Sequence, residues 1–475
     1  MSNLDQIKTA RLKKLETIKK AGLNAYPAKA KRTCFCQQAF DNFDKLIKEN
    51  ADIFLNGRLM SVREHGGSTF CHIEDATGRL QIYFKKDILG DKKYRFFLEN
   101  FDIGDFIEVK GILFATKKGE KTLKAEDFKI LAKSVLPLPE KWHGLKDVEE
   151  RFRKRYLDLI MNKQVRDNFA KRSQIIKLIR QFLENLGFME VETPMLQTLY
   201  GGAMAKPFKT HLNALDLDLY LRIAPELYLK RLLVGGFEKV YEIGRCFRNE
   251  GLDSHHNPEF TMLEFYWAYA DYQDLMNLTE EMFEFIVSRC HPESRRIVGT
   301  KDPVAKERDS SPSAQNDIAI FYQGKEISFN RPFKRIEFSE LGKTDQQIKE
   351  KIKEIIQPTF IINHPIELSP LAKQLESDTK KAARFQLVAG GLELINAFSE
   401  LNDPQEQQNR FRQQEKERQA GDKETQPYDK DFLEALEYGM PPAAGFGMGI
   451  DRLAALLTDS HSLREIILFP TMKPK

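Results

Sequence analysis

Residues 238–267 constrain the fold more than any other part of the chain. In both halves of this stretch, apolar and polar side chains alternate with a period of two, which predicts two β-strands. Residues 251–258 between them are rich in turn-forming types, so we expect the strands to pair antiparallel. One face is apolar, whereas the other carries Arg248, Glu264 and aromatic rings that we expect to be exposed. Such a face predicts a charged ligand, and a surface hairpin with cross-strand ion pairs is the alternative.

Composition limits the class of protein. With 475 residues the chain can hold two or three domains, and 41% hydrophobic and 30% charged residues are typical of a soluble globular protein. The net charge of +4 means that any nucleic-acid-binding surface must be local. No apolar run approaches a membrane span in length, and the first residues lack the pattern of a secretory signal. Five scattered cysteines predict free thiols, so we expect a cytoplasmic protein without a membrane partner.

The N-terminal part of the chain predicts a small β-barrel. Residues 53–135 contain five stretches with strand character and a helical stretch, at about residues 87–101, after the third. This is the plan of an OB-fold. Alternation turns Arg63, Phe70 and Gln81 outward, and a ring flanked by arginine and glutamine suits unpaired bases. A chance exposed phenylalanine is the alternative.

A proline-containing linker near residue 140 predicts a boundary between two domains, residues 1–145 and 146–475. A basic helix at residues 4–20 either faces solvent or follows a phosphate backbone. Residues 291–317 have little apolar periodicity and predict a mobile insertion. Further helices are predicted at residues 147–160, 165–186, 344–357 and 403–420.

Two glycine-containing stretches near the C-terminus also predict strands. Residues 384–401 predict a strand pair around a Gly-Gly turn, with Asn396, Phe398 and Glu400 on one parity. Glu393 has the other parity unless a bulge intervenes. The run Gly445-Phe-Gly-Met-Gly-Ile-Asp-Arg452 precedes an apolar helix, and its glycines would let backbone approach a ligand.

Three of these stretches together resemble one family. Phe247-Arg-Asn-Glu250, followed by residues 256–264, resembles motif 2 of the class II aminoacyl-tRNA synthetases. Within that class, its sequence is most similar to the lysyl branch. Residues 187–194 look like motif 1 and residues 445–452 like motif 3. The resemblance covers nearly the whole chain. It implies an α+β protein, in which an OB-fold precedes a class II catalytic domain with an antiparallel sheet flanked by helices.

The resemblance implies that lysine and ATP react to lysyl-adenylate, after which the lysyl group passes to the 3′ end of tRNA(Lys). It also implies a homodimer formed through the element that ends at Pro194, and an OB-fold that reads the anticodon with Arg63, Phe70 and Gln81. Arg248, Arg452 and His256 would be catalytic because they neutralise phosphate charge. The implied ATP-binding residues are Arg248, Glu250, His256, Phe260, Gly449 and Arg452.

The lysine-binding residues that the resemblance implies are Gly202, Glu226, Glu264, Tyr266, Asn396, Phe398 and Glu400. Acidic groups select a cationic side chain by penalising every other one. Related aspartyl enzymes have an arginine where this chain has Glu400, which favours lysine. An aspartyl- or asparaginyl-type enzyme and an RNA-binding paralogue without catalysis are the alternatives.

One position departs from the family. The resemblance implies Mg²⁺ as cofactor, held by two glutamates beside the ATP phosphates. The second of these is Glu393, but the first is replaced by Gln386. An amide oxygen can still bind Mg²⁺, although its formal charge is gone. The sequence therefore predicts a weakened metal site.

Overall fold

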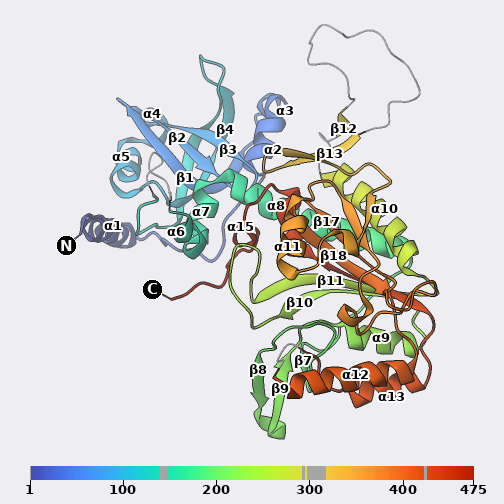
Figure 1. Cartoon of the computed structure of the whole chain (residues 1–475). Coiled ribbons are helices and arrows are strands. Elements are labelled where there is room, and N and C mark those ends of the chain that lie inside the picture. Colours follow the sequence, from blue (N-terminus) through green and yellow to red (C-terminus); the bar gives the residue numbers. More distant parts are fainter. Residues whose placement is uncertain are drawn as a thin grey trace, which may run out of the picture. The chain divides into compact units, whose positions relative to one another are not determined.

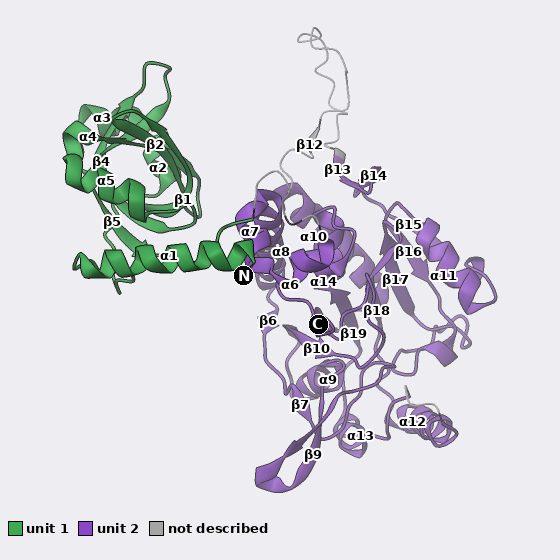
Figure 2. Ribbon diagram, turned by 90° about the vertical axis from the view of Figure 1, so that its left-hand side faces the viewer, with its two compact units in different colours: residues 1–144 green, residues 145–475 purple. Residues whose placement is uncertain are grey.

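A computed structural model describes residues 2–139, 145, 147–290, 295–296, 317–421 and 425–474. The chain divides into two compact units, residues 1–144 and residues 145–475 (Figure 2). The insertion predicted at residues 291–317 lies outside the described residues except for 295–296 and 317.

Unit 1 is a closed five-stranded barrel with strand order β1-β2-β3-β5-β4. Two helices, α4 and α5, separate β3 from β4, so the predicted OB-fold plan is confirmed. Leu80, Ile82 and Phe84 point inward and are buried, as their alternation predicts. The strands are β1 (Ile53–His65), β2 (Ser68–Glu74), β3 (Arg79–Lys85), β4 (Phe106–Ala115) and β5 (Lys121–Ala132). The helices are α1 (Asn3–Lys20), α2 (Cys36–Asp41), α3 (Phe43–Lys48), α4 (Lys86–Leu89) and α5 (Asp91–Asn100).

Unit 2 is built on an eight-stranded sheet with order β15-β16-β17-β18-β19-β11-β10-β6. Figure 1 labels four of its strands, β10, β11, β17 and β18. Its pairs are antiparallel except β15 with β16 and β10 with β6. The predicted hairpin is confirmed, with Tyr241 opposite Phe265 and Glu242 opposite Glu264. The strands are β6 (Met189–Glu190), β10 (Lys239–Phe247), β11 (Glu259–Ala268), β15 (Lys334–Glu337), β16 (Thr359–Ile362), β17 (Arg384–Ala389), β18 (Leu392–Ser399) and β19 (Ala443–Gly449).

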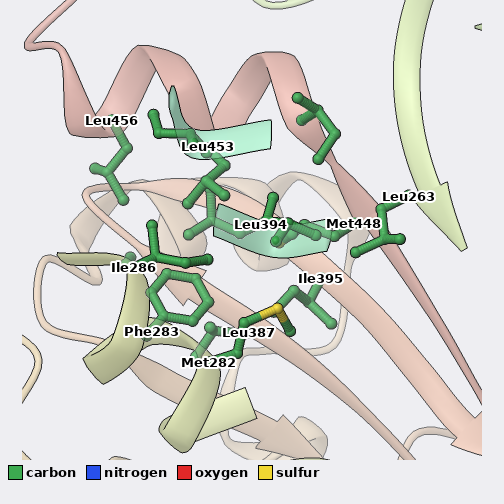
Figure 3. Close-up of a cluster of buried hydrophobic side chains, with 14 of the residues drawn as sticks. Leu263, Met282, Phe283, Ile286, Leu387, Leu394, Ile395, Met448, Leu453 and Leu456 are labelled. Atoms are coloured by element: carbon green, nitrogen blue, oxygen red, sulfur yellow. The ribbon is translucent and has the colours of Figure 1, made fainter. Parts of the chain in front are cut away.

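Helices cover both faces of this sheet. On one face α8 (Lys163–Asn185), α10 (Tyr272–Cys290) and α14 (Ile450–Leu457) form the largest apolar core with the central strands. Figure 3 shows Leu263 of β11, Phe283 of α10 and Leu453 of α14 among its side chains. On the other face α9 (Glu226–Val234), α12 (Pro404–Gln419) and α13 (Lys430–Glu437) pack on Val240, Tyr266 and Ala443. The α+β class is confirmed.

The remaining elements are short. Unit 2 also contains α6 (Val148–Arg153), α7 (Arg155–Met161), α11 (Asp345–Glu354), α15 (Leu463–Ile466), the 3₁₀ turns η1 (Asn213–Leu215), η3 (Phe338–Glu340) and η4 (Ile366–Leu368), and two small sheets. One sheet has β7 (Leu196–Gln197), β8 (Lys209–Leu212) and β9 (Leu217–Leu221), and the other has β12 (Arg295–Arg296), β13 (Asp317–Tyr322) and β14 (Lys325–Ser328).

Two predictions of regular structure are corrected. The helix predicted at residues 147–160 is two helices, because Lys154 between them has φ −108° and ψ 51° and interrupts the helical path. The strand predicted in residues 187–194 forms ladder pairs only at Met189 and Glu190. The Val191 N–H still donates to the Tyr241 backbone oxygen at 2.9 Å, and Pro194 has no N–H group with which to extend the ladder.

Candidate active site and nucleic-acid surface

The predicted site residues of unit 2 meet in one cavity of about 350 Å³. It opens on the face of the sheet opposite the main core and is walled by β11, β18, β19, the start of α9 and neighbouring loops. The predicted residues that line it are Gly202, Glu226, Arg248, Glu250, His256, Phe260, Glu264, Tyr266, Glu393, Asn396, Phe398, Gly449 and Arg452. Glu400 and Gln386 do not line it.

The hairpin and motif 3 bring cations to one end of the cavity. The Arg248 guanidinium lies 5.1 Å from the centre of the Phe260 ring, and its buried Nε has no hydrogen-bond partner. Arg452 donates through Nη1 to the backbone oxygen of Glu393 at 2.9 Å, and its Nη2 lies 3.5 Å from His256 Nε2. Asp253 accepts from the other ring nitrogen of His256 at 2.9 Å. Two arginines and a histidine therefore converge where an anion can bind.

Asp451 fixes the position of Arg452 relative to the hairpin. Its carboxylate accepts from the backbone N–H of Thr261 at 2.9 Å and from Arg172 at 2.6 Å. These bonds tie α14 to β11 and α8. Sequence reasoning assigned Asp451 no role, although it stands beside Arg452 in motif 3.

At the other end of the cavity, Glu264 is a buried carboxyl without a counter-ion. Its only described hydrogen-bond donor is the Tyr266 hydroxyl, at 3.1 Å, and within the described ranges no ion pair reaches it. Burial raises the pKa of Glu264 well above its ordinary value, and the negative charge of Glu226 adds to this. The expectation of exposed aromatic rings on this face is wrong for Tyr266, which is 3% exposed because α9 and α13 cover it.

Lys230 is a shared counter-ion of the other two acidic residues, Glu226 and Glu400. Its side chain is fully buried, its Nζ lies 2.7 Å from Glu226 Oε1, and it forms an ion pair with Glu400 Oε2. Burial alone would lower the pKa of Lys230, but the charges of Glu226 and Glu400 raise it, so the ammonium is kept. Among the residues that the structure describes, none forms a hydrogen bond with Glu400 Oε1. Sequence reasoning missed Lys230.

Gly445 lines the cavity and also leaves space for neighbouring side chains. A Cβ atom at this position would collide with Glu400 Oε1 and with the ring of Tyr266. The glycine therefore lets the Glu400 carboxylate approach Tyr266, which lines the cavity. Gly445, Gly447 and Gly449 also line the cavity, as the predicted close approach of the backbone to a ligand requires.

A bulge in β18 settles the parity of Glu393. Leu387 pairs with Ile395 and Val388 pairs with Glu393, which leaves Leu394 as the extra residue. The bulge turns Glu393 into the same cavity as Asn396.

Arg384 is a further cavity residue that sequence reasoning missed. Its Nε donates to Asn396 Oδ1 at 2.8 Å, and its Nη1 donates to the Leu368 backbone oxygen and the Ser369 hydroxyl at 2.8 and 2.9 Å. Its position opposite Phe398 in the β17–β18 pair was a usable signal.

Gln386 departs from its predicted role as a metal ligand. Its Oε1 accepts from His364 Nε2 at 2.9 Å and does not reach the cavity. Burial lowers the pKa of His364 to about 3, so this imidazole is neutral. Only Glu393 of the predicted pair lines the cavity, and no cluster of three or more His, Cys, Asp or Glu side chains suited to a metal occurs in the described part of the chain. The residues present therefore do not form the two-carboxylate site that the family resemblance implied.

In unit 1, aromatic rings extend the predicted base-binding surface. Arg63, Phe70 and Tyr83 lie opposite one another on β1, β2 and β3. The Phe70 and Tyr83 ring centres are 4.8 Å apart, and Phe114 lies 5.8 Å beyond Tyr83. The prediction of an outward-facing Gln81 is wrong, since its side chain is only 8% exposed. It lies opposite Thr122 of the neighbouring strand β5, and its Oε1 accepts from the Thr122 hydroxyl at 2.7 Å.

Among the described helices, none combines the length and apolar character needed to cross a membrane.

Comparison with known proteins matches each unit to a family model. A family model described as tRNA synthetases class II (D, K and N) matches residues 147–473, and one described as an OB-fold nucleic acid binding domain matches residues 53–131. The chain is 49% identical to a lysine–tRNA ligase of Pelotomaculum thermopropionicum, over 100% of this chain and 96% of that protein. It is 46% identical to a lysine–tRNA ligase of Carboxydothermus hydrogenoformans, over 99% of both chains. A lysine–tRNA ligase of Thermotoga maritima is 43% identical, over 99% of this chain and 97% of that one. The cavity at motifs 2 and 3 thus lies in a domain whose family is known, and the chain belongs to the class II tRNA synthetases of the D, K and N group.

Proposed function

We propose that the chain is a lysine–tRNA ligase. It forms lysyl-adenylate and pyrophosphate from lysine and ATP, and then transfers the lysyl group to the 3′ end of tRNA(Lys). The observation that carries this proposal is the buried, unpaired carboxyl of Glu264 at the closed end of a cavity whose other end is cationic. The named relatives support the same activity.

The first step needs alignment and charge neutralisation rather than a general base. A carboxylate oxygen of lysine attacks the α-phosphorus, the bond from that phosphorus to the bridging oxygen breaks, and pyrophosphate leaves. Arg248 would hold the α-phosphate and Arg452 the γ-phosphate, with His256 beside the leaving pyrophosphate. Phe260 would stack on adenine, Glu250 would accept from its amino group, and the backbone at Gly449 would border the nucleotide.

Selection of lysine rests on carboxylates that other amino acids leave unpaired. Glu264, Tyr266 and the free oxygen of Glu400 would receive the side-chain ammonium. Glu226, Gly202 and Asn396 would hold the α-amino end, and Phe398 would wall the aliphatic chain. A charge-assisted hydrogen bond contributes about 1.5–3 kcal/mol. A neutral or acidic side chain would leave buried carboxyl groups without a partner and be rejected by a similar amount.

The transfer step requires tRNA, and the barrel would recognise its anticodon. Arg63 and the rings of Phe70 and Tyr83 form a row suited to stacked, unpaired bases. Gln81 would contribute its amide nitrogen, since its oxygen is already bonded to Thr122.

Three further properties belong to this proposal. Mg²⁺ would arrive with the ATP phosphates, and Glu393 is the member of the predicted metal-binding pair that lines the cavity. A homodimer would form through residues 187–196, where Met195 and Leu196 are 45% and 49% exposed. The protein would act in the cytoplasm.

Charging of a tRNA(Lys) transcript with radiolabelled lysine tests the proposal. We expect lysine to become attached to the transcript, and a transcript with an altered anticodon to be charged more slowly. No charging by a protein that still binds the transcript would instead favour an RNA-binding paralogue without catalysis.

A further inference from the structure

Lys230 is a fully buried cation behind the cavity, and none of the proposed ATP or lysine contacts uses it. It lies one helical turn after Glu226 in α9, and its ammonium also reaches Glu400 at the end of β18. Its Nζ lies 5.6 Å from the centre of the Phe398 ring and 5.9 Å from that of Phe432. Carboxylates and aromatic rings therefore enclose it.

Each of the two carboxylates gives Lys230 only one oxygen. Glu226 uses Oε1, while its Oε2 lies at the cavity wall beside Gly202. Glu400 uses Oε2, while its Oε1 lies beside Tyr266 and Gly445 without a hydrogen-bond partner. Both second oxygens thus adjoin residues that line the cavity.

The acidic groups at this end of the cavity outnumber the cations that pair with them. Lys230 is a single cation paired with Glu226 and Glu400, and burial raises the pKa of Glu226, Glu264 and Glu400, so their ionised forms would be favoured by further cations. The other cations that face these acids are engaged elsewhere or lie at the phosphate end. Arg222 is paired with Glu242, Arg384 donates to Asn396 and to the loop at residues 368–369, and Arg248 lies over Phe260.

We propose that Lys230 is a positioning residue that sets substrate specificity, because it holds Glu226 and Glu400 from behind so that their second oxygens receive the two ammonium groups of the amino acid. This inference rests on the proposed function. A cation inside the wall favours the ionised form of the two neighbouring carboxyls, whose pKa values burial raises, and it fixes their orientation, as supporting residues do in other preorganised sites. Without it, the buried carboxyls would lose their shared counter-ion.

The test compares Lys230→Met in the full-length chain with Lys239→Met. Lys239 also lies over aromatic rings, those of Phe188 and Trp267, but outside the cavity. Lysine-dependent pyrophosphate exchange gives the KM values for lysine and ATP. Calorimetry with L-lysine in buffers of different ionisation enthalpy gives the number of protons released on binding.

For Lys230→Met we expect the lysine KM to rise at least about tenfold while the ATP KM stays within about twofold. We also expect lysine binding to release more protons than in the parent, because a carboxyl without its counter-ion takes up a proton that the incoming ammonium displaces. Lys239→Met should match the parent in all three quantities.

A lysine KM within about twofold of the parent would overturn the inference. An equal rise in the KM values for lysine and ATP, with an unchanged number of protons released on lysine binding, would also overturn it. If Lys230→Met does not fold, Lys230→Met/Glu400→Gln removes both charges of the ion pair and is compared with Glu400→Gln alone. A lysine KM no higher than that of Glu400→Gln would equally overturn the inference, and a higher lysine KM with an unchanged ATP KM would support it. If the parent itself shows no lysine-dependent exchange, the proposed function fails, which is a separate outcome.

Discussion

At the scale of single residues, the unpaired carboxyl of Glu264 makes the sharpest prediction. Glu264→Gln keeps the shape but removes the charge, so the lysine KM in pyrophosphate exchange should rise about tenfold or more while the ATP KM stays nearly constant. A lysine KM that stays within about twofold would remove Glu264 from the amino-acid site.

The same residue predicts a pH dependence. Burial and the charges of Glu226, Arg248 and Arg222 act on Glu264, and the net result is a raised pKa in the free protein. Binding of an ammonium favours the ionised form and so lowers that pKa. Lysine binding should therefore release a proton and strengthen as pH rises through the raised pKa. The rise in kcat/KM for lysine should be present in the parent and reduced in Glu264→Gln; equal profiles would contradict the assignment.

Substitutions at Gln386 test whether a second carboxylate at this position would strengthen magnesium binding near the phosphates. Gln386→Glu adds a negative charge on the strand position opposite Asn396, so the magnesium concentration at half-maximal adenylate formation should fall. Gln386→Met is the matched control, and it should leave that midpoint unchanged because the amide oxygen bonds His364. A raised midpoint in Gln386→Met would show that the amide serves the metal after all.

At the scale of elements, the aromatic row on β1, β2 and β3 predicts that tRNA binding can be weakened without affecting lysyl-adenylate formation. Phe70→Ala removes a ring from the cross-strand row, and loss of one base stack costs about 1–3 kcal/mol. The KM for tRNA should rise, while lysyl-adenylate formation stays intact. Phe106→Ala, which removes another exposed barrel ring outside this row, should change neither. Equal losses in both steps for Phe70→Ala would indicate a folding defect instead.

Strand patterns were enough to predict the barrel and the motif 2 hairpin, and the family resemblance supplied charged residues of the cavity such as Glu264 and Arg452, but neither Arg384 nor Asp451. They could not place Glu393, because alternation alone does not reveal the extra residue Leu394 in β18. They also missed Lys230. Glu226 and Lys230 at helical i,i+4 spacing are most often a solvated pair, and only the packing of α9 against β18 shows that this pair is buried.

At the scale of the whole molecule, the edge strand β6 and the exposed residues that follow it predict self-association. Light scattering at micromolar concentration should give the mass of two chains. Leu196→Glu places a charge on the exposed apolar surface and should shift the protein toward the monomer. A parent protein that is monomeric at this concentration would contradict the proposed homodimer.

The central claim is that the carboxylates at the closed end of the cavity select lysine. Pyrophosphate exchange measured with each of the twenty amino acids tests it most directly, because this reaction needs no tRNA. We predict exchange with lysine and none above background with aspartate or asparagine. Exchange that depends on aspartate or asparagine, or no exchange with any amino acid at saturating magnesium, would contradict the claim.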